Sequence, residues 1–460
     1  MYDSGETTQP PVVIRKLLRK VFSRSKRLPA GKGAVLPVSS HGLKSEQISL
    51  AARRVCSTLQ EAGFQAFVVG GAVRDLLIGI EPKDFDVATN ATPEEVKPLF
   101  RRAFIIGRRF RIVHVMIGGE TIEVSTFRAP NDDANAQTDA HGRILRDNVF
   151  GTQVDDAARR DFTVNALYYN PADQTIIDYH HGVADLKQKT LRMIGEPARR
   201  YREDPVRMLR AVRLAAKLGL VIDPAARHPI REMSDLLTNV PAARLFDEML
   251  KLLTSGHAVS CLTQLRAEGL HHGLLPLLDV ILEQPQGERF VWLALENTDS
   301  RVRQGKSISP GFLFAALLWH EVHKTWEAIK ATGESPIPAL FAAMDEVLDL
   351  QSEKLAITRR IATDIKDIWL LQPRFEQNTG KRPLRLIEQP RFRAGFDFLL
   401  LRAQAGEVAS ELADWWQRFY DASIEERLLM LEPEKSGTRK RRRRKPRSER
   451  AGDEASNSAS

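Results

Sequence analysis

The sequence predicts an α+β fold, in which a small α/β unit is followed by a long all-helical region. Short apolar runs separated by glycine-containing turns, which are typical of strands, continue to about residue 186. From Glu203 onward, apolar residues recur with a period near 3.6, which indicates helices, and strand signals nearly vanish. The 460 residues are too many for one compact core, so we expect roughly two to four domains.

Net charge and cysteine content narrow the class of protein. The formal net charge of +9 favours a polyanionic partner, because each phosphate contact releases condensed counterions. Cys56 and Cys261 are too few for a disulfide framework or a structural zinc site, and both thiols are expected to be reduced. No apolar run reaches the roughly 18 residues that span a membrane, and no secretory signal core is visible. A cytoplasmic location is therefore predicted.

Both ends of the chain are predicted to lie outside the folded core. Residues 1–46 form an extension whose segment 12–27 is basic and weakly amphipathic. That segment is either a solvated, disordered arm or a peripheral contact with anionic lipid or RNA. Residues 433–460 form a low-complexity tail, in which eight of the nine residues from 439 to 447 are Lys or Arg. Such a block stays disordered and binds polyanions, so the tail is expected to bind RNA.

The elements of the α/β unit follow from the alternation of apolar residues and from turn residues. Ser45 is expected to cap a helix whose apolar stripe includes Leu50, Val55 and Leu59, and Gly63 ends that helix. The next elements are a strand over 66–69, a turn at Gly70-Gly71, a helix over 72–78, and strands over 84–88, 110–117 and 121–127, the last two joined by a hairpin at Gly118-Gly119. The later helices are predicted over 203–218, 243–254, 258–268, 311–319, 338–350, 360–372 and 396–418.

The two glycines lie where a strand ends and a helix begins. Glycine lets backbone N–H groups approach a phosphate closely, and the N-terminus of a helix adds favourable partial positive charge. Arg74, in the first turn of that helix, is placed to reach a triphosphate as well. Gly70, Gly71 and Arg74 are therefore predicted to bind the phosphates of a nucleotide, although Gly-Gly turns are common elsewhere.

Asp84 and Asp86 are separated by one residue in a predicted strand. A period of two places both carboxylates on one face, while Phe85 and Val87 point into the core. Two converging carboxylates repel each other unless a cation lies between them, and Mg²⁺ prefers carboxylates together with phosphate oxygens. The pair is predicted to bind two Mg²⁺ ions, with Mn²⁺ as a substitute, at a centre for nucleotidyl transfer. The alternative, two solvated aspartates on an edge strand, is disfavoured by the Gly-Gly turn just upstream.

The third carboxylate of this centre is predicted to be either Glu123 or Asp161. Glu123 lies on the strand over 121–127, which could pair beside the Asp84 strand. Asp161 lies in the segment 159–166 and could complete the metal site instead. If Asp161 and Arg160 hydrogen-bond the ribose of the incoming nucleotide, Glu123 is the metal ligand. The sequence leaves both assignments open.

The segment 203–213 is rich in arginine and begins a predicted helix. Asp204 is expected to be its N-cap, with Pro205 at the first helical position. Arg207 and Arg210 then lie on the same face as Asp204. One interpretation is a ladder of salt bridges along the helix. The other is base selection: an Asp oxygen accepts from an exocyclic amine while an Arg donates to the adjacent ring nitrogen, a pairing that suits adenine or cytosine.

Four segments together resemble the motifs of the bacterial-type (class II) tRNA nucleotidyltransferase and poly(A) polymerase superfamily: 70–75, 84–91, 159–166 and 203–210. The resemblance is strongest over roughly residues 60–260. It implies a nucleotidyltransferase head of polymerase β type, a helical neck that selects the nucleobase, and a helical body that holds RNA. The expected domains are the extension 1–46, the head 47–186, the neck 187–262, the body 263–432 and the tail 433–460.

By motif matching, the resemblance implies metal binding by Asp84 and Asp86, active-site roles for Arg160 and Asp161, and base reading by Asp204 with Arg207. The predicted catalytic residues are Asp84, Asp86, Asp161 and Glu123. The predicted nucleotide-binding residues are Gly70, Gly71, Arg74, Asp75, Arg128, Arg160, Asn165, Asp204, Arg207, Arg210 and Arg213.

One further segment separates two activities within this superfamily. Residues 105–115 resemble a Gly-basic-basic-Phe-x-aliphatic-x-His signature of bacterial poly(A) polymerases rather than of CCA-adding enzymes. The basic tail also suits an enzyme that retains many RNA 3′ ends. The resemblance therefore predicts transfer of AMP from ATP to RNA 3′ ends, with mRNA and RNA-decay proteins, but not DNA, among its partners. The alternatives are a CCA-adding enzyme and a catalytically silent RNA-binding protein, which the intact aspartate pair disfavours.

Overall fold

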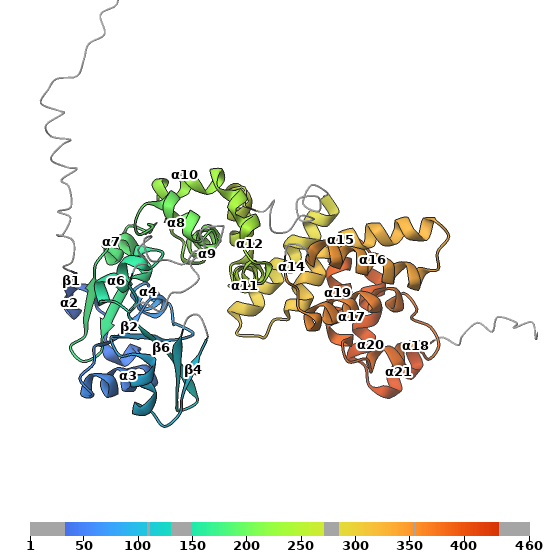
Figure 1. The fold of residues 1–460 in the computed structure, drawn as a ribbon. Coiled ribbons are helices and arrows are strands. Elements are labelled where there is room, and N and C mark those ends of the chain that lie inside the picture. The colour runs from blue at the N-terminus through green and yellow to red at the C-terminus, as the bar shows by residue number, and fades with distance from the viewer. Residues whose placement is uncertain (1–32, 108–110, 130–149, 271–284, 353–354, 432–460) are drawn as a thin grey trace, which may run out of the picture. The chain divides into compact units, whose positions relative to one another are not determined.

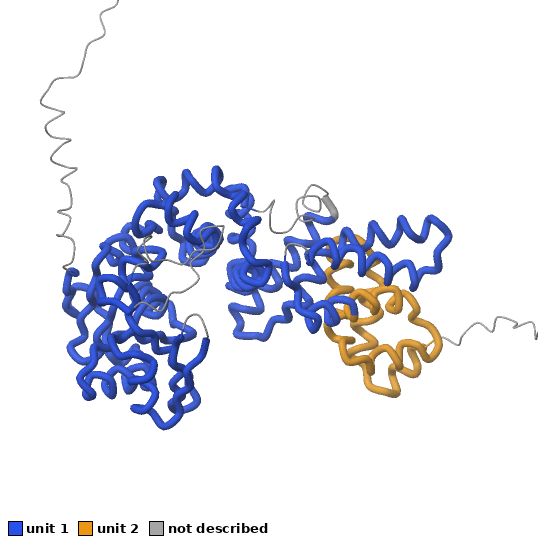
Figure 2. Tube along the Cα trace, in the orientation of Figure 1, with its two compact units in different colours: residues 1–366 blue, residues 367–460 orange. Residues whose placement is uncertain are grey.

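The computed structural model describes residues 33–107, 111–129, 150–270, 285–352 and 355–431. The chain divides into two compact units, residues 1–366 and residues 367–460 (Figure 2). The boundary between residues 366 and 367 lies inside the region 263–432, which the sequence predicts as one helical body. The tail 433–460 and the segment 12–27 lie outside the described residues.

Unit 1 contains a mixed β-sheet (Figure 1). Among the described residues this sheet has eight strands in the order β1-β8-β7-β2-β3-β6-β5-β4. Neighbouring strands are antiparallel except β3 and β6, which run parallel. In chain order the strands are β1 (Ala34–Leu36), β2 (Ala66–Val69), β3 (Asp86–Thr89), β4 (Ala103–Ile106), β5 (Ile112–Ile117), β6 (Glu120–Thr126), β7 (Leu167–Asn170) and β8 (Thr175–Asp178).

Helices pack on this sheet and bury most of its central strands. Helix α3 (Leu50–Glu61) contacts β2, β3, β5 and β6. A cluster of buried side chains joins the sheet to α6 (Gln153–Arg159). It consists of Phe67, Val69, Ala88, Phe127, Ala157 and Tyr168. Because β3 lies between β2 and β6 and is packed on both sides, its first residue, Asp86, has a fixed position at the end of a buried strand.

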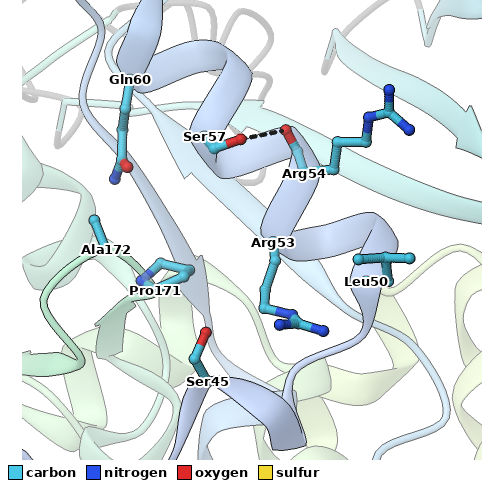
Figure 3. A pocket seen from close by; sticks show the side chains of 8 residues that line it. All are labelled: Ser45, Leu50, Arg53, Arg54, Ser57, Gln60, Pro171 and Ala172. Atoms are coloured by element: carbon cyan, nitrogen blue, oxygen red, sulfur yellow. Dashed lines mark hydrogen bonds between the residues drawn. The ribbon is translucent and has the colours of Figure 1, made fainter.

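The predicted strands of unit 1 are largely confirmed, including the hairpin, where Gly118 and Gly119 adopt φ of 61° and 89°. The predicted cap of the first helix is wrong. Ser49, not Ser45, caps α3 by accepting a hydrogen bond from the Ala52 N–H. Ser45 instead begins a 3₁₀ turn beside a surface pocket that Leu50 also lines (Figure 3). The Leu50 side chain is 71% exposed. Of the predicted stripe, Val55 and Leu59 are buried as expected, whereas Leu50 is exposed and Ala51 and Ala52 are buried beside them.

The predicted extension 1–46 also overlaps the fold. Its described end contains β1, which pairs with β8, and the short helix α2 (Val38–His41). The His41 imidazole contacts the Gln174 carbonyl at 3.1 Å and so ties this segment to the β7–β8 turn. A three-residue edge strand lacks the length needed for a clear sequence signal.

The rest of the described chain is helical apart from the short parallel pair β9 (Thr190–Leu191) and β10 (Val221–Ile222). The remaining helices of unit 1 are α4 (Gly71–Leu77), α5 (Pro93–Val96), α7 (Gly182–Lys187), α8 (Pro197–Glu203), α9 (Val206–Leu218), α10 (Pro224–Glu232), α11 (Ala242–Leu253), α12 (Ala258–Ala267), α14 (Pro285–Arg303), α15 (Pro310–Ala331) and α16 (Pro336–Ser352); α17 (Arg359–Phe375) crosses the division. Helix α14 was not predicted.

Two predicted helices differ from the structure in their extent. The helix expected over 203–218 is found as α9, which begins at Val206, one residue after the predicted first helical position at Pro205, and Glu203 ends α8 instead. Asp204, which precedes the proline, is extended. The helix expected over 396–418 is divided at Gly406, which has φ of 84° and ends a helix in the left-handed conformation. Apolar periodicity continues past Gly406, so periodicity alone could not reveal that second helix boundary.

Unit 2 is built around an aromatic core. Its helices include α18 (Arg382–Ile387), α19 (Phe392–Ala405), α20 (Ser410–Asp421) and α21 (Ile424–Met430). Phe375, Phe392, Phe396, Trp416 and Phe419 are buried together, and the Trp416 indole N–H donates to the Phe375 carbonyl at 2.8 Å. Among the described helices of both units, none is long and apolar enough to cross a membrane.

Candidate active site

Most of the predicted site residues line one cleft in unit 1, between the sheet and helix α9. The cleft is lined by Gly70, Gly71, Arg74, Asp86, Arg160, Asp161, Asn165, Asp204, Arg207, Arg210, Arg213 and Leu214. Apart from Leu214, each of these residues was predicted from the sequence. Leu214 lies one turn beyond Arg210 on the same helix, so the helical period could have found it.

The Gly-Gly turn forms one end of this cleft. Gly70 has φ of 72°, a conformation that glycine adopts without strain, and a Cβ at this position would lie 3.3 Å from the Arg160 guanidinium. Helix α4 begins at Gly71. A side chain at Gly70 would therefore be strained and would also crowd Arg160, so glycine keeps backbone open to the cleft.

Arg74 is buried and held rigidly at the cleft wall. Its guanidinium donates to the Asp75 carboxylate at 2.7 Å and to the Asn165 side-chain oxygen at 2.5 Å. Asp75 does not line the cleft; its second oxygen lies 3.8 Å from the Lys217 ammonium. Asp75 therefore pairs with Arg74 outside the cleft lining, and its nucleotide-binding role stays a prediction.

The aspartate pair differs from the predicted arrangement in one respect. Strand β3 begins at Asp86, and Asp84 precedes it with an exposed side chain. The spacing of two within one strand therefore does not position Asp84. Asp86 is accessible from the cleft, and Asp84 contributes electrostatic repulsion to it.

Glu123 lies beside Asp86 in the sheet. Strands β3 and β6 are parallel, and their register places Glu123 opposite Asp86. The protein around Asp86 displaces water and raises the pKa of its carboxyl to about 6; repulsion from Glu123 and Asp84 adds to this rise, and Arg160 opposes it. A divalent cation would relieve this repulsion. Among the described residues, no group of three or more His, Cys, Asp or Glu side chains is placed to hold a metal ion.

Asp161 is engaged by protein groups. Its Oδ1 accepts from the Asn165 amide at 2.9 Å and from the Phe162 N–H at 2.8 Å, and its Oδ2 accepts from Arg210 Nε at 2.8 Å. Burial would raise the pKa of Asp161, but Arg210 and the two hydrogen bonds outweigh it and hold that pKa well below the usual range. The Asp161–Arg210 ion pair therefore joins the segment 159–166 to helix α9.

Arg160 is fixed by the core of the sheet. Its guanidinium donates to the Asp156 carboxylate at 2.9 Å and to the Tyr168 hydroxyl at 3.1 Å. Its remaining nitrogen donates to the Asn165 carbonyl at 3.3 Å. A cation held this firmly in the cleft is positioned to meet an anionic group with little loss of side-chain entropy.

Asp204 does not cap helix α9 as predicted. Pro205 occupies the N-cap position of α9, and the backbone of Asp204 is extended at the end of α8. Its Oδ2 accepts from Arg244 at 3.0 Å. Its Oδ1 is buried and has no hydrogen-bond partner among the described residues. Because the carboxylate does not cap the helix, its Oδ1 is left without a hydrogen bond in the described chain.

The arginines of α9 pair with acids outside the predicted ladder. Arg207 pairs with Glu203 at 3.0 Å and also donates to the Arg200 carbonyl at 2.8 Å. Arg213 pairs with Glu248 at 2.6 Å. Together with the Arg210–Asp161 pair, these contacts fix the arginine face toward the cleft. The salt-bridge interpretation and the binding interpretation are thus compatible, since the same pairs orient the arginines.

Two predicted features lie partly or wholly outside the cleft. Arg128 follows β6; its backbone forms a bridge with Phe150, and it is not part of the cleft lining. Its predicted nucleotide-binding role stays a prediction. Of the signature 105–115, residues 108–110 lie outside the described residues. His114 of that signature is described, and its Nε2 lies 3.4 Å from the Glu123 carboxylate.

Comparison with known proteins identifies the family. Residues 66–192 match the poly A polymerase head domain, residues 219–282 match a probable RNA- and SrmB-binding site of polymerase A, and residues 332–449 match the polymerase A arginine-rich C-terminus. The chain is 45% identical to poly(A) polymerase I of Haemophilus influenzae over 89% of this chain and 95% of that protein. It is 43% identical to poly(A) polymerase I of Salmonella typhi over 94% of this chain and 96% of that protein. The chain belongs to the poly(A) polymerase I family.

CCA-adding enzymes are more distant relatives. That of Levilactobacillus brevis is 37% identical but over only 48% of this chain and 54% of the enzyme. Among solved structures, the Bacillus stearothermophilus CCA-adding enzyme in complex with CTP has a TM-score of 0.54 and 25% identity, with 80% of each chain covered. The fold is therefore shared with CCA-adding enzymes, whereas the full-length relatedness is to poly(A) polymerases.

Membership of this family establishes the class of reaction. The chain is a polynucleotide adenylyltransferase with a nucleotidyltransferase head and RNA-binding regions, and the predicted α+β fold is confirmed. Nucleotidyltransferases of this kind use divalent metal ions.

Proposed function

We propose that the cleft transfers AMP from ATP to the 3′-hydroxyl of RNA without a template, and that Asp84, Asp86 and Glu123 hold two Mg²⁺ ions, which Mn²⁺ can replace. The observation that carries this proposal is convergence: the Gly70 turn with Arg74, the Asp86 carboxylate and the Asp204–Arg207 pair all line one cleft. These groups suit the phosphates, the reacting centre and the base of one nucleotide respectively.

The donor set at Asp86 fits divalent cations. Asp86 has a raised pKa partly because Glu123 and Asp84 repel its carboxylate, and a cation bound beside it would relieve that repulsion. Bound ions of this kind activate an attacking hydroxyl and stabilise a leaving pyrophosphate. We assign the third carboxylate to Glu123, because it lies in register with Asp86, whereas the Asp161 oxygens accept from Arg210, Asn165 and Phe162. Asp161 then serves to position Arg210.

Base selection is assigned to Asp204 and Arg207. Adenine presents an exocyclic amine donor next to a ring-nitrogen acceptor, so it needs one acceptor and one donor from the protein. Asp204 Oδ1 is a buried acceptor without a partner in the described chain, and Arg207 supplies the donor. Glu203 and Arg244 hold the two side chains in place.

The test of this function is a polymerisation assay. Purified protein with Mg²⁺, a short unstructured RNA and ATP alone should yield long homopolymeric tails, whereas CTP alone should yield little product. Addition that stopped after about one to three nucleotides and required a tRNA would contradict poly(A) synthesis and favour CCA addition. RNA binding without incorporation would instead support a catalytically silent RNA-binding protein.

Deletion of the tail, residues 433–460, is expected to weaken RNA binding. Removing its Lys/Arg block should lower affinity at low salt and flatten the slope of log affinity against log salt, by about 0.7 for each phosphate that the tail neutralises. The measurement is RNA affinity at several salt concentrations. Deletion of residues 452–460, which contain no Lys or Arg, is the matched control. A slope unchanged in the longer deletion would mean that the basic block does not contact RNA.

Substitution of Asp161 is expected to reduce stability in a pH-dependent manner. Asp161→Asn leaves Arg210 without its ionic partner and should cost about 2 kcal/mol in the free energy of unfolding near neutral pH. Because folding lowers the pKa of Asp161, the stabilisation is complete above the unfolded pKa, near 4, and is lost as pH falls through the folded pKa. The difference between wild type and variant should therefore be constant from about pH 6 to 8 and shrink only in strong acid.

Chemical denaturation at several pH values measures this difference. Asp247→Asn, which changes an exposed aspartate on α11, is the control and should leave stability unchanged. An Asp161 effect that vanished already near pH 6 would contradict the ion pair.

Three further expectations stay predictions from the sequence. They are docking of RNA-decay proteins, peripheral membrane contact through residues 12–27, and a cytoplasmic location. DNA is not expected as a substrate.

A further inference from the structure

A row of side chains crosses the sheet from Asp86 to its edge. In the register of the strands, Asp86 of β3 is opposite Glu123 of β6, Glu123 is opposite His114 of β5, and His114 is opposite Phe104 of β4. Residues directly opposite each other on paired strands project from the same face. Because neighbouring strands lie about 4.8 Å apart, Phe104 is roughly 14 Å from Asp86 along this row.

The side chains at the β4–β5 end of this row are exposed or partly exposed in the described structure. Phe104 is 53% exposed and Ile106, on the same face of β4, is 45% exposed in the described structure. On β5, Ile112, His114 and Met116 are partly exposed, whereas the alternating Val113 and Val115 are buried. The edge of the sheet therefore presents an apolar surface with an aromatic ring. We call this surface the β4–β5 face; it consists of Phe104, Ile106, Ile112, His114 and Met116.

In the opposite direction from Asp86 the same row is closed. Val69 of β2 and Tyr168 of β7 continue the row, and both are buried in the core cluster with α6. The third side of Asp86 is the cleft of the proposed nucleotide site, whose lining contains neither Phe104 nor His114. Among the described residues, an RNA whose 3′-hydroxyl reaches Asp86 while ATP fills the cleft thus has the exposed β4–β5 face as a path along the sheet.

The chemistry of the β4–β5 face suits single-stranded RNA. Exposed aromatic rings beside basic groups form stacking platforms that accept every base. Arg101 and Arg102 lie exposed just before β4, and the Arg102 guanidinium contacts the Met116 sulfur at 3.8 Å at the end of this face. The His114–Glu123 contact connects the face to the carboxylates. The Arg102 guanidinium at the end of the face suits a phosphate of the RNA, and the Phe104 ring in its middle suits a base of the same RNA strand.

We propose that the β4–β5 face holds the 3′-terminal nucleotides of the RNA primer, with Phe104 stacking on a base a few nucleotides from the growing end. Phe104 is a positioning residue for the primer, and it has no part in the chemical step or in ATP binding. This inference rests on the proposed function, because it assumes that the primer hydroxyl reaches Asp86.

Steady-state kinetics with separate variation of RNA and ATP tests the proposal. Phe104→Ala should raise the KM for an unstructured RNA about tenfold. The KM for ATP and the rate at saturating RNA should change little, since stacking contributes equally to the ground and transition states. Phe104→Trp should restore the KM for RNA. Leu50→Ala, which removes an exposed apolar side chain on α3 at the pocket of Figure 3, should behave as wild type.

Photo-crosslinking of the unmodified enzyme provides an independent measurement. RNAs carrying one 4-thiouridine at defined distances from the 3′ end should crosslink to the peptide containing Phe104 only when the label lies within the last few nucleotides. A wild-type KM for RNA in Phe104→Ala, or crosslinks to this peptide from internal positions alone, would overturn the proposal.

A protein partner on the β4–β5 face, or a failure of the proposed polymerase activity, would give a different experimental result. An exposed edge strand can also pair with a second protein chain. If Phe104→Ala altered the oligomeric state by sedimentation and left the KM for RNA unchanged, the β4–β5 face would be a protein interface. If the wild-type enzyme failed to extend RNA at all, the proposed function would be refuted, while the crosslinking result would still report where RNA lies.

Discussion

Asp86→Ala should abolish AMP incorporation, lowering the rate by about a thousandfold or more, and Asp84→Ala should have an effect of similar size. The reason is that a bound metal ion contributes several kcal/mol to transition-state stabilisation, and each 1.4 kcal/mol corresponds to a factor of ten. RNA affinity should persist, because the basic regions that bind RNA are unchanged. The measurement is single-turnover extension of a labelled RNA with saturating ATP and Mg²⁺.

Melting temperatures show whether these variants lose activity because they no longer bind metal or because they no longer fold. Asp86 is repelled by Glu123 and Asp84, so its removal should leave the melting temperature unchanged or raise it. Glu61→Gln, at the exposed end of α3, is the matched carboxylate control and should retain full activity. Incorporation that survived in both aspartate variants would show that the metal assignment is wrong.

The same assay decides between the candidates for the third carboxylate. Glu123→Gln should weaken the Mg²⁺ dependence and shift the required Mg²⁺ concentration upward without a large loss of stability, because Glu123 is exposed and beside Asp86. Asp161→Asn should instead lower stability and leave the Mg²⁺ dependence near that of wild type. The opposite pattern would return the assignment to Asp161.

Arg207→Ala should lower discrimination between ATP and GTP by about tenfold to a hundredfold, in kcat/KM. A donor–acceptor pair that reads a base edge is worth about 1–3 kcal/mol of discrimination. Asp204→Ala should act in the same direction, because Oδ1 is the acceptor without a partner in the described chain. Competition between ATP and GTP at equal concentration, read from the composition of the product tail, measures the change.

Arg207 also has a structural contact that the control must address. It donates to the Arg200 carbonyl and pairs with Glu203, so its removal could disturb the α8–α9 junction. Arg202→Ala changes an exposed arginine on α8 that is not part of the cleft lining, and it should leave discrimination unchanged. If Arg207→Ala lowered activity equally with ATP and GTP, the arginine would support the junction rather than read the base.

Local sequence signals predicted much of the site because its motifs are short and continuous. The Gly70-Gly71 turn, the β5–β6 hairpin and the arginine face of α9 each depend on residues within about one helical turn or one hairpin. The errors have local causes as well. Gly406 interrupts a helix whose apolar period continues, and Ser49 competes with Ser45 as a cap only four residues away. In each case, two signals of similar strength were present.

The aspartate pair differs from its predicted geometry, and its role in binding metal stays a prediction. The sequence predicts Asp84 and Asp86 as neighbours within one strand, yet only Asp86 belongs to β3. The repulsion between them still appears in the raised pKa of Asp86. Two residues this close in the chain stay close in space whatever the local conformation, so the repulsion between the carboxylates does not require both to lie in one strand.

The sequence by itself determined the class of fold, the family motifs and the identity of most cleft residues, because these follow from continuous segments. The tertiary structure alone decided which groups meet. Parallel pairing of β3 with β6 brought Glu123 beside Asp86, Arg210 reached Asp161 across 49 residues, and Arg244 reached Asp204 across 40. Sequence spacing carries no distance information over such separations, since only strand register and helix packing fix which side chains face each other. The same register extends the row from Asp86 through Glu123 to Phe104, a residue that no motif singles out.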